Sequence, residues 1–170
     1  FKTRSLARWE PEIVRPICER LVDEFLAAGT ADLSVEPAMT HEQTQSALRL
    51  GAELATAQIA SGCNVLAFGE MGIGNTTPAA ALLAAMTSHP VVACVGRGTG
   101  IDDATLARKC RLVEQALERI EGCQDPLTLL AEVGGFEIAQ ITGGILAAAE
   151  AGMGHIELAK WADLVLIAPA

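Results

Sequence analysis

The stretch from Val65 to Ala81 constrains the fold more than any other part of the chain. It predicts a strand, a glycine-rich loop and a helix in direct succession. Residues 65–68 are all apolar, which is typical of a buried parallel strand. Gly69, Gly72 and Gly74 follow, and glycines allow positive φ angles and a close approach of the backbone to a ligand.

A helix is predicted directly after this loop. Thr76 or Thr77 would cap its N-terminus, and Pro78 suits the first helical position. The unpaired N–H groups and the positive end of the helix dipole would then face the loop, which favours binding of an anion such as a phosphate. Glu70 strengthens a functional interpretation, because a carboxylate in an anion loop is costly unless it meets a donor or a cationic centre. A tight turn without a ligand stays open as the alternative.

Two known glycine motifs do not fit this loop. No Lys follows the last glycine, which excludes a Walker loop. The glycines are spaced G-x-x-G-x-G, whereas the dinucleotide fingerprint requires G-x-G-x-x-G.

A second unit of the same kind follows. Residues 91–95 are predicted to form a strand, residues 96–100 (GRGTG) a second glycine loop, and Asp102 or Asp103 the cap of a helix that reaches about Glu121. Two such units indicate an α/β fold with a parallel sheet, whose ligand would lie beyond the carboxyl ends of the strands. Arg97 and Lys109 are the basic residues near this edge, although position alone favours a surface lysine at 109.

Further helices are predicted along the chain. Their ranges are 1–29, 40–60 (with a Thr40–Gln43 capping box), 126–133, 137–151 and 156–161, followed by a strand at 164–167. The helix at 137–151 has hardly any polar face, which predicts burial in the core or in a subunit interface. Gly143 and Gly144 in its middle would permit a close approach of another backbone.

Composition excludes several classes of function. The net charge of −9 argues against non-specific nucleic-acid binding, because a phosphate backbone needs a basic face. No apolar run reaches the roughly 20 residues of a membrane span, no signal peptide is visible, and Phe1 suggests a start inside a longer protein. The histidines at 41, 89 and 155 lie too far apart to predict a metal site. Five scattered cysteines, without a C-x-x-C pair, predict reduced thiols and a cytoplasmic location.

Motifs between about residues 37 and 149 resemble the nicotinate-nucleotide–dimethylbenzimidazole phosphoribosyltransferases of cobalamin assembly. They are PAMT (37–40), GEMGIGNTTPAAA (69–81), VGRGTGIDD (95–103), ARK (107–109), DPL (125–127) and GGFEIAQITGGILAAA (134–149). The resemblance implies a Rossmann-like, doubly wound parallel sheet in a single three-layer domain over residues 37–170, preceded by a helical segment at 1–36. It also implies a homodimer without a cofactor or a metal ion.

The resemblance further implies a reaction and its residues. The phosphoribosyl group of nicotinate mononucleotide would move to 5,6-dimethylbenzimidazole, giving α-ribazole 5′-phosphate and nicotinate. Glu70 would lie close to the reacting base. The residues that would hold the phosphate are Gly69, Gly72, Gly74, Asn75 and Lys109, and those that would complete the floor of the pocket are Gly96, Gly98 and Thr99.

The chain departs from this family in two ways. Family members are much longer, and their C-terminal part carries a glutamate that acts as general base, without a counterpart before Ala170. Residues 151–170 instead resemble the flavin-binding phosphopantothenoylcysteine decarboxylases, with His155 at the position of an active-site histidine. The alternatives are therefore an FMN-binding module of the decarboxylase type, or an inactive truncated or chimeric domain.

Overall fold

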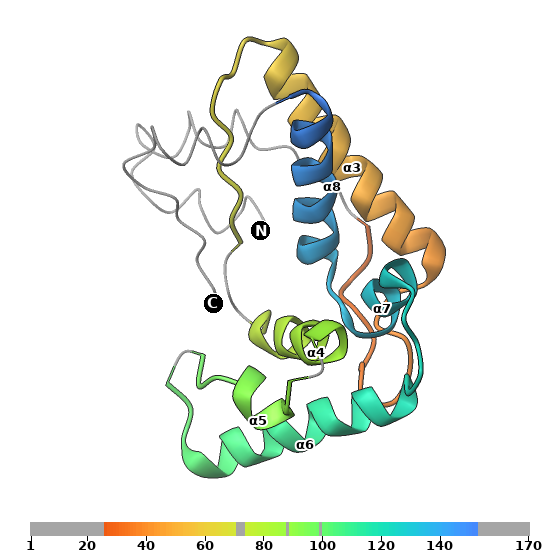
Figure 1. Cartoon of the computed structure of the whole chain (residues 1–170), viewed down its shortest axis with the longest axis vertical. Helices are drawn as coiled ribbons and strands as arrows, with labels where there is room; N and C mark the ends of the chain where they lie inside the picture. Colours follow the sequence, from red (N-terminus) through yellow and green to blue (C-terminus); the bar gives the residue numbers. More distant parts are fainter. Residues whose placement is uncertain (1–25, 71–73, 88, 99, 153–170) are drawn as a thin grey trace.

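The computed structural model describes residues 26–70, 74–87, 89–98 and 100–152 (Figure 1). The helices of this part are α3 (His41–Ala60), α4 (Thr76–Thr87), α5 (Val91–Cys94), α6 (Asp103–Arg119), α7 (Pro126–Val133) and α8 (Phe136–Glu150). The predictions for residues 1–25 and for 153–170, which include the helix at 156–161, the strand at 164–167 and His155, lie outside the described residues.

Side-chain caps set where several helices begin, as the sequence predicts. Thr40 Oγ1 accepts a hydrogen bond from the Gln43 N–H at 3.1 Å, and the Gln43 side chain returns one from the Thr40 N–H at 2.9 Å. Asp102 and Asp125 cap α6 and α7, and each carboxylate accepts from the backbone N–H three residues later at 2.8 Å. These contacts also lower the pKa of both carboxyl groups.

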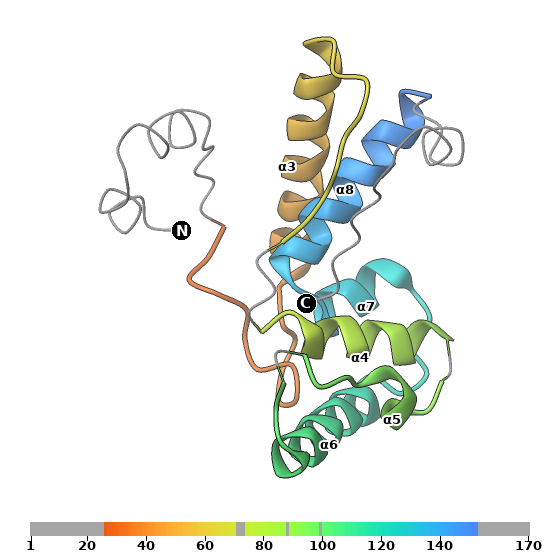
Figure 2. The same cartoon turned by 90° about the vertical axis from the view of Figure 1, so that its left-hand side faces the viewer.

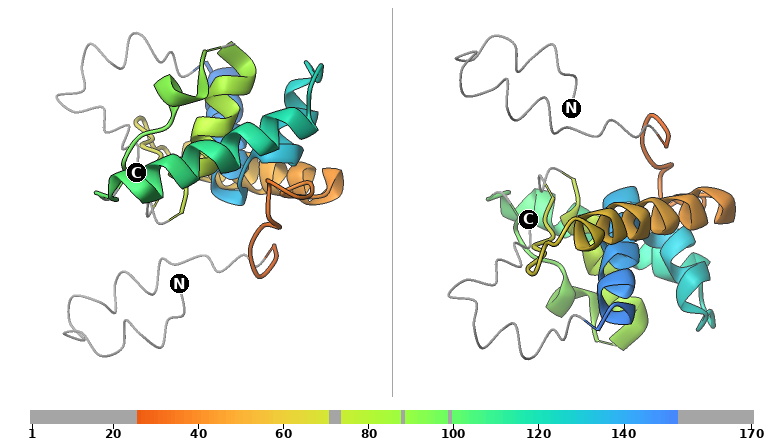
Figure 3. Two further views of the ribbon diagram at one scale, coloured as in Figure 1. Left: turned by 90° about the horizontal axis from the view of Figure 1, so that it is seen from below. Right: turned by 90° about the horizontal axis from the view of Figure 1, so that it is seen from above.

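Helices α3 and α8 lie side by side (Figures 1 and 3), and their glycines lie against the backbone of the other helix. A Cβ atom on Gly143 would lie 1.9 Å from the Leu48 carbonyl oxygen, and one on Gly51 would lie 1.8 Å from that of Gln140. The predicted close approach at Gly143 is therefore confirmed. In this single chain Ile145 and Leu146 of α8 are 39% and 57% exposed, so the core covers only part of the helix and the subunit interface stays a prediction.

Helices α4, α5, α6 and α7 form the other part of the described chain (Figure 2). Helix α4 contacts α5, α6 and α7, and α5 also contacts α6. Their core is continuous with that of α3 and α8 and consists largely of small and medium apolar side chains. Its most buried members on these helices include Ala81, Val113, Ala116 and Val133. This packing fixes the start of α4 against α6, where the candidate site lies.

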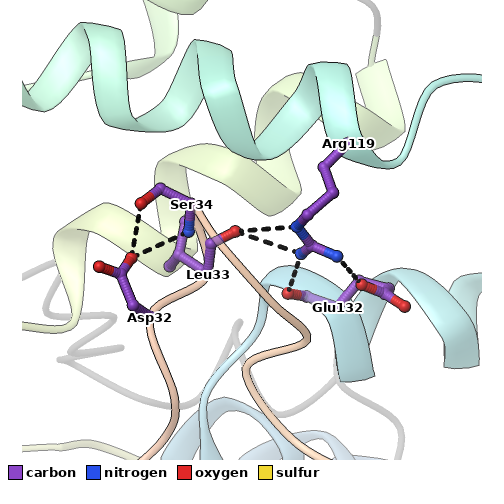
Figure 4. A network of polar contacts seen from close by, with 5 residues as sticks. All are labelled: Asp32, Leu33, Ser34, Arg119 and Glu132. Atoms are coloured by element: carbon purple, nitrogen blue, oxygen red, sulfur yellow. Dashed lines mark hydrogen bonds and ion pairs between the residues drawn. The ribbon is translucent and has the colours of Figure 1, made fainter.

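Arg119, at the end of α6, binds both α7 and the segment around Leu33 that precedes α3 (Figure 4). Its guanidinium pairs with the Glu132 carboxylate and donates to the Glu132 carbonyl at 3.0 Å. It also donates to the Leu33 carbonyl, at 3.2 Å from Nη2 and 3.4 Å from Nε. One side chain thus joins two consecutive helices to a segment 86 positions earlier in the sequence.

The predicted strands are absent from the described residues. The strand prediction for residues 91–95 is wrong, because α5 forms there, with the Val95 N–H donating to the Val91 carbonyl at 2.9 Å. Residues 64–68 have no regular structure, and Val65 is 60% exposed. A β-strand needs a neighbour to pair its backbone groups, and an isolated one is not stable. The Rossmann-like sheet is therefore not seen in this part of the chain.

Candidate functional site

Lys109 connects the two glycine-loop units. Its ammonium group donates to Thr76 Oγ1 at 2.5 Å, at the first residue of α4, and to the Gly96 carbonyl at 3.2 Å, at the start of the second loop. The residue is only 8% exposed. The interpretation of Lys109 as a surface lysine is therefore wrong.

The register of α6 explains this position. Lys109, Val113 and Ala116 recur at spacings of four and three, so they share one face of the helix, and all three are buried. The apolar members pack into the core, and the same face carries Lys109 toward the start of α4. Burial lowers the pKa of the Lys109 ammonium, because removal from water disfavours its charged form.

A cavity of about 380 Å³ opens beside Lys109. Its lining residues are Gly74, Thr76, Thr77, Arg97, Gly98, Ile101, Thr105, Arg108, Lys109 and Leu112. Three of these described residues are basic and none is acidic, although the whole chain carries a net charge of −9. The start of α4 adds the positive end of its dipole. The cavity therefore suits an anion.

Glycine is required at two points of its wall. Gly74 and Gly98 have φ angles of 85° and 54°, which residues other than glycine rarely adopt. A Cβ on Gly98 would also lie 3.3 Å from Thr76 Oγ1. The second loop can thus approach the start of α4 closely, which brings the loops of both units to one place.

Helix α4 begins two residues earlier than predicted. Its first residue is Thr76, and the Asn75 carbonyl accepts from the Ala79 N–H at 3.1 Å, so Asn75 occupies the cap position. A second cavity of about 240 Å³ shares Thr76 and Gly98 with the first. It is lined by Asn75, Thr76, Ala79, Ala80, Leu83, Cys94, Gly96 and Gly98.

The structure brings most of the predicted site residues together. Gly74, Asn75, Gly96, Gly98 and Lys109 line one or both cavities or contact each other there. Gly69 and Glu70 are described but are not lining residues of these two cavities. The other two predicted site residues, Gly72 and Thr99, lie outside the described part.

Sequence reasoning missed three contributors to this region. Thr76 was expected only as a helix cap, yet its hydroxyl accepts from Lys109. Arg108 lines the larger cavity, and its place beside Lys109 in the ARK motif could have pointed to it. Glu137 accepts a hydrogen bond from the Asn75 side chain at 2.6 Å, across 62 positions of sequence that give no local signal.

Comparison with known proteins defines the class of protein to which the chain belongs. The profile of a family described as phosphoribosyltransferase matches residues 8–156, a match that begins earlier and ends later than the resemblance at 37–149. The nicotinate-nucleotide–dimethylbenzimidazole phosphoribosyltransferase of Photobacterium profundum is 52% identical over 131 residues, which are 76% of this chain and 38% of the relative. The enzyme of that name from Shewanella loihica is 49% identical over 156 residues, which are 88% of this chain and 46% of the relative.

Solved structures agree with the sequences. A crystal structure of CobT from Thermus thermophilus matches with a TM-score of 0.75 at 48% identity, over 78% of this chain and 40% of that one. A crystal structure of a phosphoribosyltransferase of the same description, also from Thermus thermophilus, matches with a TM-score of 0.64 at 40% identity, over 78% of this chain and 41% of that one.

The chain belongs to the nicotinate-nucleotide–dimethylbenzimidazole phosphoribosyltransferase family. It spans about two fifths of the length of the relatives above, between 38% and 46%. The resemblance of residues 151–170 to flavin-binding decarboxylases is not borne out, and the family match itself extends to residue 156. Among the described residues, none of the helices has the length and hydropathy that a membrane crossing requires.

Proposed function

We propose that this chain supplies the nucleotide-binding part of a phosphoribosyltransferase. The reaction moves the phosphoribosyl group from nicotinate mononucleotide to 5,6-dimethylbenzimidazole and yields α-ribazole 5′-phosphate and nicotinate. One observation carries the proposal: the buried Lys109 ammonium joins the start of α4 to the second glycine loop beside a cavity lined by basic residues. The names of the relatives specify the two substrates.

The phosphate of the nucleotide binds between Lys109 and the start of α4. The ammonium donates a charge-assisted hydrogen bond, and the backbone N–H groups of Gly69, Gly72, Gly74 and Asn75 supply further donors in the first loop. Gly96, Gly98 and Thr99 complete the floor of the pocket. The positive φ of Gly98 and its close approach to Thr76 support this arrangement.

Glu70 acts on the reacting sugar. Breaking the bond between ribose and nicotinate gives the sugar carbon the character of an oxocarbenium ion, and a nearby carboxylate stabilises that developing positive charge. Fixing the phosphate holds the ribose in place while the second base attacks. Glu70 is partly buried and precedes Gly74 in the same loop, which is consistent with a position beside the phosphate site.

The remaining features are also proposals. Residues 37–170 belong to an α/β domain, and the complete protein is a cytoplasmic homodimer with a Rossmann-like sheet. The helical segment predicted before this domain is not proposed for residues 26–36, which the structure describes without a helix. Residues 64–68 would join this sheet in a protein of the length of the relatives, where neighbouring strands can pair with them. The described cysteines Cys63, Cys94, Cys110 and Cys123 are free thiols.

The test is release of nicotinate from nicotinate mononucleotide by the purified chain, with and without dimethylbenzimidazole. Release that depends on the second substrate is the expected result for the transferase. Calorimetric titration with nicotinate mononucleotide alone measures the binding step separately. A chain that neither binds the nucleotide nor releases nicotinate contradicts the proposal.

A further inference from the structure

A hydrogen bond joins the starts of α4 and α8. Asn75 Nδ2 donates to Glu137 Oε1 at 2.6 Å, across 62 positions of sequence. An ionised carboxylate only accepts hydrogen bonds, so the amide nitrogen of Asn75 must be the end that faces Glu137. The contact therefore fixes the orientation of the Asn75 side chain at the cap position of α4, immediately after Gly74.

The local structure of α8 allows Glu137 to reach Asn75. Glu137 lies in the first turn of α8, where the positive end of the helix dipole stabilises a carboxylate. Gly135 is the buried cap residue of this helix, and a Cβ on it would lie only 2.4 Å from Glu137 Oε1. Its φ of −145° suits any residue, so glycine is needed here for space.

We propose that Glu137 is a positioning residue for the nucleotide site and acts through Asn75. By holding the Asn75 amide, it keeps the first turn of α4 in the orientation that presents its N–H groups to a phosphate. Direct contact between Glu137 and the phosphate would be repulsive, so an indirect role fits the charges. This inference rests on the proposed function, because Asn75 contributes to phosphate binding only if the nucleotide binds there.

The test is a double-mutant cycle on the affinity for nicotinate mononucleotide, measured by calorimetry. Asn75→Ala and Glu137→Ala each remove the same contact, and each is expected to weaken binding about tenfold. The double variant should lose no more than the larger single loss, because residues that act as a unit are not additive. Unchanged affinity in Glu137→Ala, or additive losses in the double variant, overturns the inference.

Two further variants separate positioning from a general loss of structure. Glu137→Gln keeps a side-chain oxygen that accepts from Asn75, so it should retain most of the affinity that Glu137→Ala loses. Gly135→Ala keeps the carboxylate but displaces it, so it should weaken binding as Glu137→Ala does. Glu150→Ala, at the exposed end of the same helix, is the matched control. Equal affinities of Glu137→Gln and Glu137→Ala contradict a positioning role.

The same titrations distinguish the two proposals. If the unmodified chain binds the nucleotide and Lys109→Ala weakens binding while Glu137→Ala does not, the function stands and the role of Glu137 is wrong. If the unmodified chain does not bind the nucleotide, both proposals fail. Thermal melting of each variant confirms that it is folded when its affinity is measured.

Discussion

Lys109 and Thr76 are 33 positions apart in sequence, yet the lysine ammonium lies 2.5 Å from the threonine hydroxyl. The contact couples α6 to the first residue of α4 at the edge of the larger cavity. A lysine that is 8% exposed loses most of its hydration, so its charge needs oxygen acceptors. An anion in the cavity would supply a stronger partner than the two neutral oxygens, Thr76 Oγ1 and Gly96 O.

Lys109→Ala is therefore expected to weaken binding of nicotinate mononucleotide by about 1.5–3 kcal/mol, the usual contribution of a hydrogen bond to a charged group. Calorimetric titration measures the loss, and thermal melting checks that the variant folds. Arg111→Ala is the matched control, because Arg111 is exposed on the same helix and does not line the cavity. Equal affinities of the two variants would show that Lys109 does not bind the phosphate.

Binding should also depend on pH through Lys109. Burial lowers the pKa of its ammonium below the ordinary value of 10.5, so the residue loses its proton at a lower pH than an exposed lysine. Affinity for the nucleotide should therefore fall as pH rises through this lowered pKa. Lys109→Met cannot titrate at this position, so its weaker binding should show a flatter pH profile. Parallel profiles would contradict the assignment.

The lowered pKa of Lys109 also affects stability, and here the free energy of unfolding should rise with pH, whereas nucleotide affinity should fall. Between the lowered pKa and 10.5 the unfolded chain holds the Lys109 proton more tightly than the folded chain, so the free energy of unfolding rises with pH in this window. Urea unfolding at a series of alkaline pH values measures this slope. Lys109→Met serves as the reference, because it lacks only this titratable group. A slope as steep in Lys109→Met as in the unmodified chain would show that Lys109 is not its source.

Local chemistry made the helices predictable. Thr40 with Gln43, and the aspartates at 102 and 125, carry their caps within three residues of sequence, and all three helix starts agree with the structure. The glycine loops were also predictable from the sequence, and Gly74 and Gly98 adopt the positive φ angles expected there. The family was recognisable because its motifs cluster around these same loops.

Structure that depends on contacts between residues distant in sequence was harder to predict. Residues 91–95 have the composition of a strand, but VVAC forms a helical turn after Pro90, because strand propensity depends on a neighbouring strand. The burial of Lys109 follows from the register of α6 against α4, which no local pattern reports. The Asn75–Glu137 contact likewise depends on how two helix starts meet.

Gly143→Ala tests the close approach of α3 and α8. The added Cβ would lie 1.9 Å from the Leu48 carbonyl oxygen, so the two backbones must separate. We expect a loss of about 1–3 kcal/mol in the free energy of unfolding, despite the better helix propensity of alanine. Leu146→Ala on the same helix is the control, since Leu146 is 57% exposed and its change should be small. Urea denaturation compares them, and an unchanged or higher stability of Gly143→Ala would contradict the observed close approach.

Arg119→Met tests the junction of the segment before α3 with α6 and α7. The Arg119 and Glu132 side chains are only 22% and 21% exposed, and the guanidinium also donates to the Leu33 and Glu132 carbonyls. Its removal leaves a largely buried carboxylate without this partner, which should cost about 3 kcal/mol of unfolding free energy. Arg119→Lys should recover only part of this loss, because a single ammonium cannot reproduce the fork of donors.

The control for this junction is the exposed ion pair between Arg97 and Asp103, whose side chains are 54% and 89% exposed. Arg97→Met should change the free energy of unfolding by less than about 1 kcal/mol, and high salt should reduce even this difference. The loss in Arg119→Met should persist at high salt, because salt screens a buried pair much less. Urea denaturation at two salt concentrations measures both. If the two variants lost similar amounts, or if salt abolished the effect at Arg119, the junction would contribute no more than a surface ion pair.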